Sequence, residues 1–91
     1  MCINICGMQF ETLKSTLEKF PSTLLGNEES REIHFVKSKN AYFFDRNRQC
    51  FEAILYYYQS NGTLIRPPNI PMKLFAEEIK FTLRVFMVFL N

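Results

Sequence analysis

Hydrophobic and polar residues alternate at the start of the chain. Ile3 and Ile5 flank the polar Asn4, and the alternation resumes over residues 8–11 after Gly7. A period of two is typical of a strand with one buried face. The pattern therefore predicts two short strands that open the fold.

The spacing then changes to that of a helix. Leu13 and Leu17 lie four residues apart in the segment 12–20, and Pro21 follows it, where a proline ring cannot continue a helix. We therefore predict a helix over 12–20. The polar, acidic segment 27–32 has no apolar periodicity, and we predict an exposed loop there.

Further strands are predicted from short β-prone runs. The runs 33–36 and 42–44 are separated by the polar segment 37–40, whose composition suits a turn, and we expect the two strands to pair. The run 63–66 predicts a last short strand. This strand should end before Pro67, since a proline has no N–H to donate to a ladder.

Two longer helices are predicted from apolar residues at i, i+3, i+4 and i+7. The first ends at Asn61-Gly62, a left-handed stop, and the second opens at Pro71. Tyr56 and Tyr57 lie off the first stripe, so this helix has apolar surface for a second contact. The stripes are Phe51, Ile54, Leu55 and Tyr58, and then Met72, Phe75, Ala76 and Ile79. Together these elements predict one mixed α+β domain.

Composition narrows the functional classes. The 91 residues carry a net charge of +2 with no basic run, so nucleic-acid binding is not expected. Three cysteines without paired spacing fit a reducing compartment, and the N-terminal residues lack the basic start and long apolar core typical of a signal peptide, so we expect a cytosolic location. The apolar run 85–90 is far short of the ~20 residues of a membrane span. Because the chain stops at Asn91 directly after that run, we expect a truncated or alternative product.

The aromatic content is high, with ten Phe and four Tyr. These aromatic side chains are expected to be buried either in a wide core or in an interface with another chain. His34 is the only histidine, and Cys50 is expected to be a small buried side chain. With isolated glycines and no convergent acid, base and nucleophile, we predict no enzyme activity, no small-molecule substrate, no metal and no cofactor.

Charged residues gather where the first long helix starts. Asp45 is predicted to be its N-cap. Arg46 and Arg48 oppose the helix dipole there, so we expect them to pair with carboxylates elsewhere. Pairing with a carboxylate of a neighbouring copy of the chain is favoured over pairing within the same chain.

Seven segments together closely resemble the cytoplasmic tetramerisation domain of Shaker-type voltage-gated potassium channels. They are Ile3-Asn4-Ile5, Phe10-Glu11-Thr12, Phe20-Pro21, Thr23-Leu24-Leu25-Gly26, Tyr42-Phe43-Phe44-Asp45-Arg46-Asn47-Arg48, 53–60 and 77–81. The resemblance covers residues 1–81 and implies a BTB/POZ-like fold. Residues 82–91 depart from the family and form a divergent apolar tail.

The resemblance also implies a function. Such domains form a four-fold ring below the pore and select which subunits assemble, so we expect a homotetramer that also joins related channel subunits but does not conduct ions alone. The implied intersubunit residues are Thr12, Asp45, Asn47, Arg48 and Gln59. The resemblance further implies that a cytosolic channel β-subunit could dock on such a domain. The alternative is a BTB-type adaptor that recruits a cullin ubiquitin ligase, since these adaptors share the fold.

Overall fold

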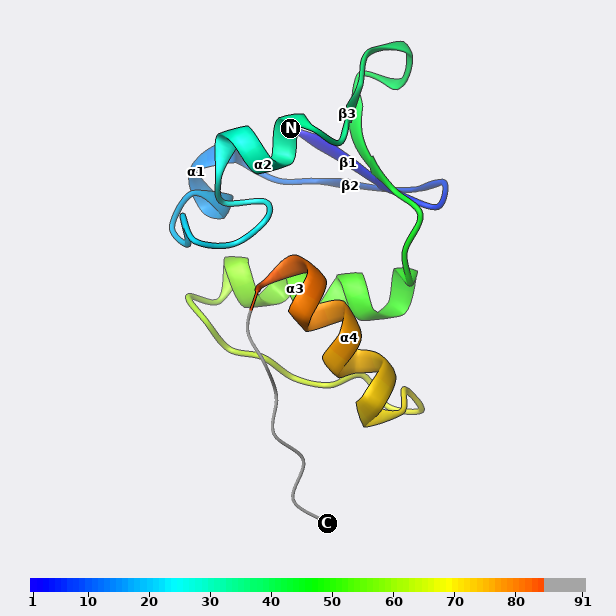
Figure 1. The fold of residues 1–91 in the computed structure, drawn as a ribbon. Coiled ribbons are helices and arrows are strands. Elements are labelled where there is room, and N and C mark those ends of the chain that lie inside the picture. Colours follow the sequence, from blue (N-terminus) through cyan, green and yellow to red (C-terminus); the bar gives the residue numbers. More distant parts are fainter. Residues whose placement is uncertain (85–91) are drawn as a thin grey trace.

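A four-stranded sheet organises the upper half of the molecule in Figure 1. The computed structural model describes residues 1–84, and the sequence prediction for 85–91 lies outside the described residues. The strands are β1 (Cys2–Ile5), β2 (Met8–Glu11), β3 (Phe35–Val36) and β4 (Ala41–Phe44), in the order β2-β1-β4-β3. The β1–β2 and β3–β4 pairs are antiparallel, as the period-two pattern and the turn between them predict, whereas β1 and β4 are parallel.

The helices lie beside and below this sheet. Figure 1 shows α3 (Arg48–Gln59) and α4 (Met72–Thr82) on one side of the sheet, while α1 (Lys14–Leu17) and α2 (Glu28–Glu32) lie at one end of it. A single 3-10 turn, η1 (Lys37–Lys39), joins β3 to β4. The two long helices and the mixed α+β class predicted from the sequence are confirmed.

The core lies between the sheet and the pair α3 and α4. Ile3 and Ile5 of β1 are fully buried, and Phe44 of β4 is nearly so. They pack with the predicted stripes of the two helices, of which Ile54 and Ile79 are representative. Because β4 ends at Phe44 and α3 begins at Arg48, only three residues connect the sheet to this helix.

The first helix is much shorter than predicted. Helical backbone covers only Lys14–Leu17 within the predicted segment 12–20. Leu13 is the extended residue before that helix, with 70% of its surface exposed, whereas Leu17 is fully buried. The predicted apolar stripe is wrong at Leu13, because an extended residue does not share the helical face.

The segment predicted as an exposed loop contains α2. Asn27 caps this helix by accepting a hydrogen bond of 2.9 Å from the backbone of Ser30, and Glu28 and Glu29 occupy the first turn, where acidic side chains favour the helix dipole. The buried residue is Arg31, which donates to the carbonyl of Leu25 at 3.0 Å. The loop prediction is wrong because a charged residue takes the buried position, which apolar periodicity cannot detect.

The strand predicted at 63–66 is also wrong. No strand forms there, and the hydroxyl of Ser60 accepts a hydrogen bond of 3.0 Å from the backbone of Thr63. Ile65 is 59% exposed and therefore has no buried sheet face to join. Local turn bonding overrides the β propensity of this short run.

Candidate subunit interface

Asp45, Asn47 and Arg48 lie together at the junction between β4 and α3. Asn47 is the N-cap of α3, and its side-chain oxygen accepts a hydrogen bond of 2.9 Å from the backbone of Cys50. The prediction that Asp45 caps the helix is therefore wrong. The helix begins at Arg48, so the residue immediately before it has the extended backbone from which a side chain reaches the third helical N–H.

Asp45 instead contacts the hairpin turn between β1 and β2. The thiol of Cys6 donates to Oδ1 of Asp45 at 2.8 Å, and the guanidinium of Arg48 donates to the backbone carbonyl of Cys6. The hydrogen bond to Asp45, some desolvation and the negative charge of Asp45 raise the pKa of the Cys6 thiol. The thiol therefore remains a donor at neutral pH, and the turn is held between an exposed carboxylate and an exposed guanidinium.

Arg46 forms its ion pair within its own chain. Its Nε lies 2.9 Å from Oε2 of Glu78, a residue of α4 whose side chain is only 8% exposed. The guanidinium also lies over the ring of Phe81, with 4.2 Å between its carbon and the ring centroid. The expectation that Arg46 meets a carboxylate of a neighbouring copy is wrong, because the packing of α4 brings Glu78 beneath it. For Arg48 a partner in another copy stays a prediction.

Thr12 and Gln59 lie away from this cluster. The backbone of Thr12 donates to Met1 at 3.1 Å, which places it at the open end of the hairpin, about 17 Å from the turn at ~3.4 Å per residue. Gln59 is the last residue of α3, about 16 Å from Arg48 at ~1.5 Å per residue. The structure thus groups three of the five predicted interface residues and separates the other two. A ring requires two different surfaces on each copy, so one contiguous patch is not needed.

Sequence reasoning missed Cys6 as a neighbour of Asp45. Its place in a two-residue turn between two alternating strands is the sequence signal that could have singled it out. Among residues 1–84, no group of three or more His, Cys, Asp or Glu side chains could hold a metal ion.

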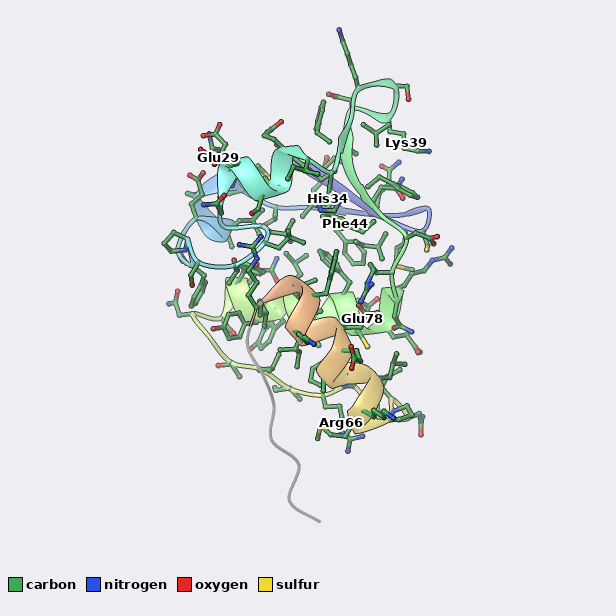
Figure 2. The ribbon with its side chains drawn as sticks, viewed as in Figure 1. Glu29, His34, Lys39, Phe44, Arg66 and Glu78 are labelled. Carbon is green, nitrogen blue, oxygen red and sulfur yellow. The ribbon has the colours of Figure 1, made fainter. Side chains whose placement is uncertain are left out.

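The other two residues considered for chemistry are part of the packing. Cys50 is fully buried, and burial together with the charge of Glu78 raises its thiol pKa, so the expectation of a small buried side chain is confirmed. His34 lies in the turn before β3 and not in a strand, since β3 begins at Phe35. Its ring stacks on Phe44 with 4.5 Å between centroids (Figure 2), and burial lowers its pKa.

The family profile described as BTB/POZ domain matches residues 1–84. The chain belongs to the BTB/POZ domain family. The BTB/POZ fold expected from the quoted segments is therefore confirmed. Within the described part of this BTB/POZ domain, no helix has the length and apolar character needed to cross a membrane.

Curated relatives of the BTB/POZ domain include subunits of potassium channels. The chain is 57% identical over 79 residues to potassium voltage-gated channel subfamily A member 4 of Homo sapiens and to subfamily A member 2 of Mus musculus. It is 56% identical to subfamily A member 10 of Gallus gallus. Each match covers 87% of the chain, but only 12%, 16% and 15% of these relatives respectively. The resemblance to the Shaker-type channel domain is thereby confirmed for this segment.

Proposed function

We propose that this BTB/POZ domain is the subunit-assembly domain of a voltage-gated potassium channel. It forms a homotetramer and determines which related subunits join the same ring. The observation that carries the proposal is the 57% identity over 79 residues with proteins named as channel subunits. Identity at this level extends through surface positions as well as the core, so surface contacts are expected to be shared with those relatives.

The β4–α3 junction supports this proposal with a suitable surface. Asp45 and Arg48 are exposed side chains of opposite charge held beside one turn. Such a pair offers acceptor and donor groups to the next copy, and charged contacts of this kind set partner choice and register more than bulk affinity. Thr12 and Gln59 lie far enough away to belong to the second surface that each copy needs in a ring.

The remaining features of the proposal follow from the family. We assign the domain to the cytoplasmic face of the membrane within a channel complex, with a cytosolic channel β-subunit as a candidate further partner. Its role is assembly and not catalysis. The relatives' names favour a channel over a cullin adaptor. Recovery of a cullin, and of no channel subunit, in a pull-down with the whole chain would reverse this preference.

Sedimentation equilibrium on the whole chain tests the proposal. We expect a tetramer for the natural sequence and, for Asp45→Ala and Arg48→Ala separately, an assembly weakened by about tenfold or more, because each change leaves a charged partner unmatched. Lys73→Ala, which removes an exposed charge from α4, is the matched control and should assemble normally. Circular dichroism checks that the variants remain folded.

Two results would contradict the proposal. A natural chain that stays monomeric at high protein concentration would exclude self-assembly by this domain. If the natural chain is tetrameric while both charge variants assemble as tightly as Lys73→Ala, assembly stands but the assignment of its interface to Asp45 and Arg48 is wrong.

A further inference from the structure

The turn between β1 and β2 places a cysteine in an unfavourable backbone conformation. Ile5 pairs with Met8, so Cys6 and Gly7 alone form the turn, with φ of +50° and +95°. Positive φ at both positions is the pattern of a type I′ turn, for which Asn-Gly and Gly-Gly are the preferred pairs. Glycine would adopt the conformation of Cys6 without strain, whereas cysteine does not.

The side chain of Cys6 has a specific contact that compensates for this strain. Its thiol donates to Oδ1 of Asp45 across 39 residues of sequence, at a distance of 2.8 Å. The turn is also held by the guanidinium of Arg48 on the Cys6 carbonyl and by Asn4, whose side-chain oxygen accepts from the Gly7 backbone at 2.7 Å. The Cys6 N–H also donates to the carbonyl of Phe44 at 2.9 Å, so three residues other than Asp45 hold the backbone of the turn.

The thiol restricts how Asp45 can lie. Asp45 is exposed and follows the last residue of β4, so few packing contacts limit its rotation. A hydrogen bond to Oδ1 restricts the carboxylate to orientations that keep this oxygen within reach of the thiol. Ordering an exposed side chain before it binds reduces the entropy that association must otherwise cost.

We propose that Cys6 is a positioning residue of the assembly surface: its thiol holds the Asp45 carboxylate in the orientation in which it meets the next copy of the chain. This inference rests on the proposed function, because it assigns a residue to the same interface. It assigns Cys6 no contact of its own with the neighbouring copy.

Backbone strain and the thiol contact predict opposite effects of one substitution. Cys6→Gly removes the thiol and also relieves the turn, so the isolated subunit should unfold at an equal or higher temperature while the tetramer becomes weaker. Without the thiol, the Asp45 side chain must be ordered on association, which corresponds to an affinity loss of about three- to tenfold. Cys6→Ser retains a donor and should assemble within about twofold of the natural chain. A residue that only stabilises the turn would change both quantities in the same direction.

The experiment is sedimentation equilibrium on the whole chain. Thermal unfolding of the monomer is measured separately, at a protein concentration low enough for the tetramer to dissociate. The variants are Cys6→Gly, Cys6→Ser, Asp45→Ala and the double variant that combines Cys6→Gly with Asp45→Ala. Cys2→Ser, at the start of the strand that leads into the turn, is the control cysteine. If Cys6 acts through Asp45, the double variant should assemble no more weakly than Asp45→Ala alone.

The outcomes separate this inference from the proposed function. A tetrameric natural chain with Cys6→Gly assembling equally tightly, or with additive effects in the double variant, would overturn the role of Cys6 and leave assembly intact. Parallel losses of monomer stability and assembly in Cys6→Gly would also overturn it, since they indicate a structural residue. A natural chain that remains monomeric would overturn the proposed function and this inference together.

Discussion

Among substitutions of a single glycine by alanine, Gly26→Ala is expected to destabilise this domain most. The backbone of Gly26 lies against the turn that follows α1, and its N–H donates to the hydroxyl of Thr23 at 3.1 Å. A Cβ placed on Gly26 would overlap the carbonyl oxygen of Phe20 and lie 2.8 Å from that of Leu17. Both are backbone atoms, so neither can yield by a change of rotamer.

The size of the effect follows from how firmly that backbone is held. The hydroxyl of Thr23 donates to the same Phe20 carbonyl at 2.7 Å, and the hydroxyl of buried Tyr58 donates to Thr23 at 2.7 Å. Relief of the overlap must therefore disturb a buried network as well as the turn. Overpacking with backbone displacement costs roughly 3 kcal/mol or more, which for a domain of this size lowers the melting temperature by at least about 12 °C.

Gly62→Ala provides a control that separates overlap from backbone strain. Gly62 has a φ of +108°, and the nearest atom to an added Cβ is Cζ of Phe20 at 3.8 Å, so only the conformational cost of about 1 kcal/mol applies. Thermal unfolding followed by circular dichroism compares the two variants. If Gly26→Ala melts within about 4 °C of the natural chain, or no lower than Gly62→Ala, the steric reasoning is refuted.

Two further predictions concern buried polar groups. Burial raises the pKa of Tyr58 to about 12 from 10, so the folded state favours the neutral phenol, and its contribution is complete below pH 10 and lost between pH 10 and 12. Between pH 8 and pH 11, urea unfolding should show a loss of roughly 1.4 kcal/mol, about half of the ~2.7 kcal/mol that the full shift implies. The loss should be smaller in Tyr58→Phe, and equal losses in both chains would exclude Tyr58 as the cause. Arg46→Ala should cost about 1–2 kcal/mol, since Glu78 stays buried without its cation, although the 35% exposure of Arg46 limits the effect. A melting temperature equal to that of Lys73→Ala would show that the ion pair does not stabilise the fold.

Local patterns predicted those parts of this fold whose stabilising contacts repeat along the sequence. The alternation around Gly7 correctly predicts the first hairpin, and the i, i+3, i+4, i+7 stripes correctly predict α3 and α4. The sequence prediction fails at 12–20, where Leu13 is extended, and at 63–66, where a hydrogen bond between Ser60 and Thr63 forms a turn in place of a strand. Periodicity needs several turns or strand residues to outweigh one such bond.

The candidate site shows the same division. The chain itself placed Asp45, Asn47 and Arg48 at a strand-to-helix junction, because they are adjacent in sequence and precede a clear apolar stripe. Only the tertiary structure decided which of them caps the helix, and it paired Arg46 with Glu78 and brought Cys6 to Asp45. These contacts join residues 32 and 39 positions apart. Such pairs depend on how the sheet packs against α3 and α4. A local pattern of hydrophobic and polar residues contains no information about contacts between residues so far apart in the sequence.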